Sequence, residues 1–378
     1  MTVKIFLTGV TGYIGGDAFY ALYEKHPEYE YALLVRNEER AAPVKKAYPK
    51  VRIVLGGLED ASVIEKEAAA ADIVIHTAGS ADDEPSAKAI AKGLAEGHTP
   101  EKPGFWLHIS GTGILQWVRH IQRERERFFF FQYLSEWPLT PQPQYDMRNK
   151  RYGEAPLPDQ DYHDIRDIDR ILSLPDDAIH RDIDKIVLGS NSPSVRTAIV
   201  GPPTIYGRGR GPTNQRSIQV PSLAQATLEK GFAPIVAPGK AEWDNVHVHD
   251  LSRLFVKLAE ATQDASKNAD PEILGPRAYY FVESGTHAWR EVAGWVAEEA
   301  FKQGFLPAAL TKETTMKEVL QSDGKANATW GFNSKSKAER ARKYFGWEAE
   351  SRSLREDIAD TVAFEAKKLG IQPKEKKQ

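Results

Sequence analysis

Four glycines crowd one stretch near the start of the chain, TGVTGYIGG at residues 8–16. Gly9, Gly12 and Gly15 have the spacing G-x-x-G-x-x-G, and they follow the short apolar run VKIFL. The chemistry of such a turn is phosphate binding: the first glycine allows a tight turn, the second lets the backbone approach a pyrophosphate, and the third lets a helix pack closely. The N-terminus of that helix presents free N–H groups to the phosphate. The alternative is a glycine-rich turn without a ligand, because a single glycine motif is weakly specific.

Alternating strands and helices are needed to position such a turn. Helical apolar spacing follows it in GDAFYALYEKHPEY, and four more strand-like runs come after, EYALLVRN, KVRIVLGGLED, AADIVIHTAGS and GFWLHISGTGIL. Helical patterns such as ASVIEKEAAAA lie between them, which predicts an α/β fold with a doubly wound parallel sheet, the Rossmann fold. In such a sheet the ligand lies beyond the carboxyl ends of the strands. Small or polar residues stand at these ends, so a turn without a ligand becomes the weaker interpretation.

The residue after the second strand distinguishes between two dinucleotides. An acidic residue there suits the ribose of NAD, whereas an arginine suits the 2′-phosphate of NADP. This chain has LLVRNEER, so Arg36 occupies that place, and a guanidinium forms paired charge-assisted hydrogen bonds with phosphate. We therefore expect NADP(H), with NAD(H) as the alternative, because Glu38 and Glu39 follow closely. Leu58, after the third strand, is expected to pack on the adenine ring.

Five stretches together resemble the extended and atypical short-chain dehydrogenase/reductase superfamily, which includes the NAD-dependent epimerase/dehydratases and the NmrA-like proteins. They are the glycine stretch beginning at Thr8, VIHTAG, AIVGPPTIYGRG, WDNVHVHDLSRL and SKAERARKYFGW. The resemblance implies a Rossmann domain with a smaller C-terminal substrate lobe. It also implies that the glycine turn, the fourth-strand motif and a proline-containing turn over the nicotinamide hold the cofactor. The residues expected to hold it are Arg36, Leu58 and Lys185, together with Thr8, Gly9, Thr11, Gly12, Tyr13, Ile14, Gly15, Thr77, Ala78, Gly79, Pro202 and Ile205.

The proton-transfer residues of that superfamily depart from their usual pattern here. Active members use a Ser or Thr after the fifth strand and then Tyr-x-x-x-Lys on the next helix. The tyrosine moves the hydroxyl proton, and the lysine holds the nicotinamide ribose. Thr112 matches the hydroxyl position, but no Tyr-x-x-x-Lys stands at the expected place. The stretch DDAIHRDIDKIVLGS is the best candidate for the helix, because its isoleucines and valine form one apolar stripe.

Three basic residues of this predicted helix are candidates for the chemistry. Lys185 resembles the family lysine, and Arg181 stands where the tyrosine would be. Arginine does not donate a proton at neutral pH, whereas His180 is able to, because imidazole titrates near neutral pH. The alternative is that these residues form a salt-bridged helix face. Tyr162 and Tyr206 are two further hydroxyls that we consider in place of the missing tyrosine.

The composition of the whole chain narrows the classes of function. The chain has 378 residues, a formal net charge of −3 and no cysteine. It therefore lacks a basic field for nucleic acid, and cysteine-based zinc sites are excluded. We expect no metal, because one H-x-H is too sparse a ligand set. No apolar run approaches the ~20 residues that span a bilayer, and the first residues do not resemble a signal peptide. We expect a cytoplasmic protein with a small-molecule substrate and without nucleic-acid or membrane partners, and we consider a homodimer.

The resemblance also implies a division of the chain into domains. The Rossmann domain is expected at residues 1–200 and about 243–282, the substrate lobe at about 201–242 and 283–350, and a C-terminal helix and tail at 351–378. An atypical insertion at about 116–150 interrupts the resemblance, because it sets four phenylalanines against alternating Arg and Glu and then a proline-rich run. We consider four interpretations of this insertion: a lid, a flap that binds a partner, an exposed apolar segment that promotes aggregation, and sequence from an unremoved intron.

Together these features favour an NADP(H)-dependent oxidoreductase acting on a small carbonyl or hydroxyl compound. In this hypothesis Thr112 orients the substrate oxygen, Lys185 holds the ribose, and His180 or a tyrosine supplies the proton. Two alternatives stay open. One is an NmrA-like protein that senses dinucleotide without turnover, which the missing tyrosine favours. The other is an epimerase or dehydratase that retains its cofactor.

Overall fold

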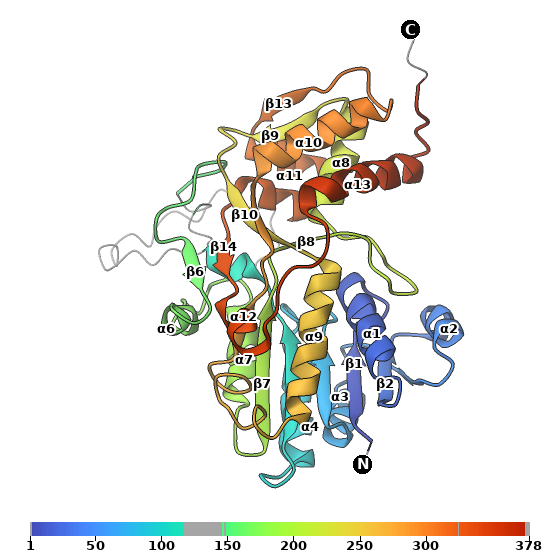
Figure 1. Ribbon diagram of the computed structural model, residues 1–378, viewed down its shortest axis with the longest axis vertical. Coiled ribbons are helices and arrows are strands. Elements are labelled where there is room, and N and C mark those ends of the chain that lie inside the picture. Colours follow the sequence, from blue (N-terminus) through green and yellow to red (C-terminus); the bar gives the residue numbers. More distant parts are fainter. Residues whose placement is uncertain (1, 117–145, 147–148, 324, 375–378) are drawn as a thin grey trace.

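Seven strands form the central sheet, in the order β11-β7-β5-β4-β1-β2-β3 (Figure 1). The computed structural model describes residues 2–116, 146, 149–323 and 325–374. The strands of this sheet are β1 (Lys4–Thr8), β2 (Glu30–Val35), β3 (Arg52–Leu55), β4 (Ile73–His76), β5 (Gly104–Ile109), β7 (Val195–Gly201) and β11 (Tyr279–Phe281). Every neighbouring pair is parallel. The doubly wound parallel sheet predicted from the alternating pattern is thus confirmed.

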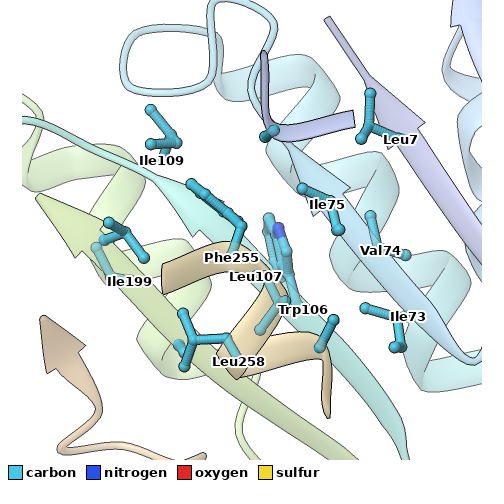
Figure 2. Close-up of a cluster of buried hydrophobic side chains, with 14 of the residues drawn as sticks. Leu7, Ile73, Val74, Ile75, Trp106, Leu107, Ile109, Ile199, Phe255 and Leu258 are labelled. Carbon is cyan, nitrogen blue, oxygen red and sulfur yellow. The ribbon is translucent and has the colours of Figure 1, made fainter. Parts of the chain in front are cut away.

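Helices cover the sheet because the strands are apolar on both faces. On one face α1 (Tyr13–Lys25) packs against α9 (Val248–Gln263), and α2 (Glu38–Ala47) contacts β2 and β3. On the other face α3 (Ala61–Ala70) packs against α4 (Glu84–Gly97), which also contacts α7 (Arg181–Gly189). Figure 2 shows Phe255 and Leu258 of α9 lying over β5 beside Leu107, and all three side chains are fully buried. Burying each side chain of this size contributes ~2 kcal/mol to folding.

The strand order reverses between β1 and β4. From β1 the sheet continues to β2 and β3, whereas from β4 it continues to β5, β7 and β11. Thr8 at the end of β1 is paired with His76 at the end of β4. In open α/β sheets this reversal opens a crevice at the carboxyl ends of the two strands, and ligands bind there. The fold therefore brings the glycine turn and the segment after β4 to one place.

A second apolar core belongs to elements from the later part of the chain. Strand β8 (Thr204–Tyr206) pairs with β10 (Glu242–His247), which pairs with β12 (Gly285–Ala288), and β9 (Ala233–Val236) pairs with β13 (Thr311–Thr314). The helices beside them are α8 (Gln219–Lys230), α10 (Trp289–Lys302), α11 (Met316–Asp323), the short η2 (Lys325–Gly331) and α13 (Leu354–Lys368). Their buried side chains form a cluster separate from that of the central sheet. The numerical domain limits expected from the sequence stay a prediction.

Several shorter elements surround the central sheet, and the apolar side chains that they bury belong to its core. Strand β6 (Asp161–His163) pairs with β14 (Lys335–Lys337), α6 (Ile168–Leu172) precedes α7, and α12 (Glu339–Phe345) contacts β11. The turn η1 (Thr112–Gln116) follows β5. The predicted insertion at about 116–150 lies almost entirely outside the described residues.

One expected helix differs from its prediction. The stretch that starts at Asp176 becomes helical only at Arg181, and His180 in front of it has a left-handed φ of 67°. This shift decides which side chains of α7 face the sheet.

Candidate functional site

The glycine turn has a shape that only glycine allows. Gly9 has a φ of +90°, and a Cβ atom there would collide with the hydroxyl of Thr77. A Cβ atom at Gly15 would collide with the Gly9 carbonyl oxygen and with the same hydroxyl. The N–H of Gly12 donates to the Gly9 carbonyl oxygen over 2.8 Å, which closes the turn. The first and third glycines are therefore required by the fold itself.

The second glycine leaves the start of α1 open. A Cβ atom at Gly12 would meet only the Gly9 carbonyl oxygen, at 3.1 Å, and Gly12 has an ordinary φ of −87°. Gly12 is also the residue at the N-cap of α1, and no side chain caps this helix. The first N–H groups of the helix therefore remain available to an anion. An open backbone face beside uncapped N–H groups fits a dinucleotide pyrophosphate.

Thr8 ties the glycine turn to the end of β4. Its hydroxyl oxygen accepts from the N–H groups of Thr77 and Ala78 at 3.2 and 3.3 Å, and it lies 2.7 Å from Nδ1 of His76. The Thr77 hydroxyl donates back to the Thr8 carbonyl oxygen over 2.6 Å. Burial lowers the pKa of His76 to about 4, so the ring is neutral and Nδ1 accepts the proton of Thr8. His76 was not predicted as a site residue, although it belongs to the VIHTAG motif.

The predicted adenosine side of the site lies after β2 and β3. The Arg36 side chain is exposed, and it forms no ion pair with an acidic side chain among the described residues. Its neighbours are engaged elsewhere: the Asn37 side chain caps α2 by accepting from the N–H of Arg40 at 3.0 Å, and Glu38 pairs with Lys45. Leu58 is half-buried, and its Cδ1 atom lies 3.3 Å from a Cβ position at Gly79. The structure thus brings Leu58 and the segment after β4 together.

The predicted turn over the nicotinamide lies beside the glycine turn. The Tyr13 hydroxyl donates to the carbonyl oxygens of Tyr206 at 3.0 Å and Gly207 at 2.6 Å. Pro202 is buried, and its carbonyl oxygen accepts from the N–H of Thr112 over 3.0 Å. These contacts join the glycine turn after β1 to the end of β8, and the end of β5 to the end of β7. Ile205 and Ile14, which follows Tyr13 in the first turn of α1, are both partly buried and pack against the main core.

Thr112 lies at the carboxyl end of β5 but is fully buried. Its hydroxyl oxygen accepts from the indole N–H of Trp243 over 3.2 Å, and its carbonyl oxygen accepts from the Ser334 hydroxyl over 2.7 Å. Both partners belong to the later part of the chain. Thr112 therefore joins the two cores, and its hydroxyl oxygen already accepts a hydrogen bond from the protein.

Lys185 and Arg181 do not join the group of residues at the end of β5. The Lys185 side chain is 47% exposed, and its Nζ atom lies 2.9 Å from a carboxylate oxygen of Asp176. The Arg181 guanidinium is buried and donates to the carbonyl oxygens of Leu172 and Leu174. These contacts hold the segment between α6 and α7.

His180 lies over the turn that follows β5. Its Nε2 atom is 3.3 Å from the Cβ positions of both Gly111 and Gly113, so a side chain at either position would crowd the ring. Nδ1 donates to a carboxylate oxygen of Asp82 over 2.8 Å, which leaves Nε2 as the titrating nitrogen. Burial acts to lower the pKa of His180, but the hydrogen bond and charge of Asp82, the charge of Asp184 and a hydrogen bond with the Ala81 backbone together raise it above its usual value. The His180 ring is thus positioned by Asp82 at the end of β5, where it is able to act as a general acid or base.

Asp184, one helical turn after His180, was missed by the sequence analysis. It is fully buried, and one of its carboxylate oxygens accepts from the Tyr279 hydroxyl over 2.9 Å. That hydroxyl lies 3.4 Å from the hydroxyl of Ser110. The other oxygen of Asp184 has no hydrogen-bond partner among the described residues. Burial raises the pKa of Asp184 to about 6, and its negative charge favours a protonated His180.

The two tyrosines considered from the sequence have other roles. The Tyr206 hydroxyl donates to the Arg352 carbonyl oxygen over 2.9 Å. Tyr162 is fully buried in the main core, and the Arg170 guanidinium lies 3.8 Å from its ring centre. Across the described parts of the chain, no group of three or more His, Asp or Glu side chains is arranged to hold a metal ion. Nor does any described helix combine the length and apolar character needed to cross a membrane.

Known proteins match nearly the full length of the chain. The family model of NAD(P)H-binding proteins matches residues 9–101, which include the glycine turn and β4. The chain is 36% identical over 378 residues to the oxidase ucsJ of Acremonium sp., and the match covers 98% of this chain and all of that protein. It is also 26% identical over 342 residues to an uncharacterized protein of Schizosaccharomyces pombe, covering 84% of this chain and 92% of that protein.

Solved structures show the same fold at lower sequence identity. The dTDP-glucose 4,6-dehydratase DesIV from Streptomyces venezuelae, solved with NAD bound, has a TM-score of 0.61 at 16% identity and covers 97% of this chain and 98% of that chain. The UDP-glucose 4-epimerase of Thermotoga maritima has a TM-score of 0.57 at 13% identity and covers 97% of this chain and all of that chain. With its full-length match, this chain belongs to the same family as the oxidase ucsJ, it carries an NAD(P)H-binding domain, and it has the fold of the NAD-dependent epimerases and dehydratases.

Proposed function

We propose that this chain is an NADP(H)-dependent oxidoreductase that acts on a small carbonyl or hydroxyl compound, with His180 as the proton donor and acceptor. The observation that carries the proposal is the imidazole of His180, held by Asp82 over the glycines after β5. In the superfamily that the chain resembles, the tyrosine that moves the proton belongs to the helix before the sixth strand. Here α7 is the helix at that place. The full-length relative named as an oxidase supports redox chemistry.

The dinucleotide is expected to lie with its phosphates at the glycine turn and its adenosine toward Leu58 and Arg36. The collision positions at Gly9 and Gly15 and the open face of Gly12 support this fit. The exposed guanidinium of Arg36, without an ion-pair partner among the described residues, supports a preference for the 2′-phosphate of NADP(H). When bound, such a cofactor supplies or takes a hydride.

His180 and its neighbours then handle the proton. During reduction, the protonated Nε2 of His180 donates to the oxygen of the substrate carbonyl, and during oxidation the neutral Nε2 takes the proton of the hydroxyl group. Asp82 holds the Nδ1 proton and fixes the tautomer. The Asp82 side chain is 72% exposed, so the pair is in reach of water, which renews the proton. Asp184 adds a second negative charge that stabilises the imidazolium form.

The test is a substrate screen with matched variants. Purified protein would be mixed with NADPH and a panel of aldehydes and ketones, and with NADP⁺ and the matching alcohols, while absorbance at the nicotinamide band is followed. His180→Gln should lower turnover by about 10³ to 10⁴ and leave NADPH binding intact, whereas Lys185→Gln, in the helix that follows His180, should change neither. Tight binding without turnover across the panel would contradict the enzyme and favour a dinucleotide-sensing protein.

A further inference from the structure

A segment after β8 lies along the first two turns of α1. We call residues 207–213 the strap. Gly211 of the strap packs directly on the backbone of Gly16, and a Cβ atom at Gly211 would come within 2.8 Å of the Gly16 Cα atom. Neither glycine leaves space for a side chain, so the two backbones are in close contact. The strap is therefore seated on the helix that begins at the glycine turn.

A buried carboxylate fastens the strap to α1. Asp17 is fully buried, and it accepts three hydrogen bonds from Arg210: from the backbone N–H at 2.8 Å, from Nε at 3.0 Å and from Nη2 at 2.6 Å. The same guanidinium lies 4.7 Å from the ring centre of Tyr20, also on α1. A bidentate arginine pair with a buried partner is among the more rigid contacts in proteins.

Helix α9 holds the same carboxylate from the other side. The Ser252 hydroxyl donates to Asp17 over 2.6 Å, and Nε2 of His249 lies 3.0 Å from the carbonyl oxygen of Arg208 in the strap. Burial acts to raise the pKa of Asp17, but the hydrogen bonds from Arg210 and Ser252 and the charge of Arg210 keep it below its usual value. Asp17 is therefore a charged anchor shared by α1, α9 and the strap.

The two ends of the strap are bound to the glycine turn itself. At one end the Gly207 carbonyl oxygen accepts from the Tyr13 hydroxyl over 2.6 Å, and at the other end the Thr213 hydroxyl donates to the Thr11 carbonyl oxygen over 2.8 Å. Thr11 and Tyr13 flank Gly12, whose open face is the expected pyrophosphate position. The strap therefore brackets the phosphate end of the site.

We propose that the strap is a latch on the bound dinucleotide, fastened by Asp17 and Arg210, and that opening it limits cofactor release. The inference rests on dinucleotide binding at the glycine turn, as in the proposed function, but not on any catalytic step. While Arg210 is held by Asp17, both ends of the strap stay on the glycine turn, and a bound dinucleotide leaves only after this segment lifts. The same contacts fix the turn before binding, so the site is formed in advance.

Stopped-flow fluorescence tests the latch without any substrate. Protein loaded with NADPH would be mixed with excess NADP⁺, and the decay of bound NADPH fluorescence gives the release rate. Arg210→Gln should speed release at least tenfold, and Thr213→Val, which removes one exposed hydroxyl, should speed it several-fold without affecting folding. Arg277→Gln is the matched control, because Arg277 forms an arginine–aspartate pair with Asp169 beside the edge strand β11; it should leave release unchanged.

The outcomes separate the two proposals. Release rates that stay within twofold of the parent for both strap variants, with unchanged melting temperatures, would overturn the latch and leave the proposed function standing. Should Arg210→Gln fail to fold, the Thr213→Val rate decides alone. Faster release in the variants, with turnover absent in every protein, would support the latch and overturn the enzyme. Failure of the parent to bind NADPH or NADH would overturn both.

Discussion

Replacing His180 by glutamine removes the titrating group and keeps most of its surroundings. The glutamine amide is able to donate to Asp82, and it has a similar reach over Gly111 and Gly113. The protein should therefore fold with a similar melting temperature and bind NADPH normally. What disappears is a group that exchanges a proton near neutral pH, so the variant isolates the proton-transfer step from cofactor binding.

The expected loss follows from the role of a positioned acid or base. Such a group typically contributes a factor of about 10² to 10⁴ in rate, which corresponds to ~3–5 kcal/mol of transition-state stabilisation. Because His180 is held by Asp82 at 2.8 Å, its contribution is expected in the upper half of this range. The loss should fall on kcat rather than on KM.

The pH dependence has a definite sign. The pKa of His180 is raised by Asp82, so the imidazolium is present below this raised value and is lost as pH rises through it. Carbonyl reduction should therefore fall on the alkaline side of the raised pKa, and alcohol oxidation should rise there. In Asp82→Asn the hydrogen bond is kept but the charge is gone, so both limbs should move toward lower pH by ~1 unit.

Steady-state rates in both directions from pH 5 to 9 measure this effect. Lys185→Gln serves as the control, because Lys185 is half exposed and pairs with Asp176. A His180→Gln variant that keeps more than a third of the parent kcat would refute the role of His180. If the two limbs of the pH–rate profile keep their positions in Asp82→Asn, a group other than His180 titrates. A large loss in Lys185→Gln would restore the lysine role implied by the family resemblance.

Three other predictions concern separate parts of the site. Arg36→Asp should weaken NADPH binding at least tenfold and NADH binding much less, as measured by calorimetry; an unchanged preference would remove Arg36 from the site. Thr8→Val takes away the acceptor for two backbone N–H groups and the donor to His76, so thermal or urea unfolding should show a loss of ~2 kcal/mol; a loss below ~0.5 kcal/mol would contradict the assigned network. Tyr279→Phe removes the hydroxyl that donates to the buried Asp184. The pKa of Asp184 is about 6 in the fold against ~4 in the unfolded chain, so the loss of folding stability should be larger at pH 8, where Asp184 is charged, than at pH 5. Equal losses at the two pH values would argue against a charged Asp184.

The sheet and the glycine turn were predictable because their signals are local. An apolar run of four to six residues, followed by glycines and a helical pattern, predicts a strand, a turn and a helix without information from the rest of the chain. The collision positions at Gly9 and Gly15 explain why these two residues are glycines, while Gly12 is free for its ligand. The segment after β4 was also predictable, since parallel strand ends meet at one edge.

The proton-transfer residues were harder to predict because they depend on which face of α7 is buried. Both Arg181–Lys185 and His180–Asp184 have helical i, i+4 spacing, and both pairs are polar. The later start of the helix and the left-handed φ of His180 direct His180 and Asp184 toward the sheet, whereas Lys185 reaches the surface. A rotation of one residue, about 100°, separates the two arrangements, and sequence spacing alone does not distinguish them.

Long-range partners could not be predicted for a different reason. Tyr279 reaches Asp184 from a strand 95 positions later, and Trp243 reaches Thr112 across 131 positions. No local pattern contains such pairings, because they follow from the strand order and from the packing of the two cores. The same is true of Asp17 and Arg210, which lie 193 positions apart.

The most direct test of dinucleotide binding at the glycine turn is a calorimetric titration of the parent and of Gly12→Ala with NADPH. The added methyl group meets one protein atom, the Gly9 carbonyl oxygen, in a tight contact of 3.1 Å, so the variant should fold with at most a modestly lower melting temperature. Its methyl group nevertheless fills the open face where the pyrophosphate is expected. One molecule of NADPH should bind per chain in the parent, and the affinity should fall at least tenfold in the variant. Equal affinities in two well-folded proteins would contradict the assignment of the glycine turn as the cofactor site.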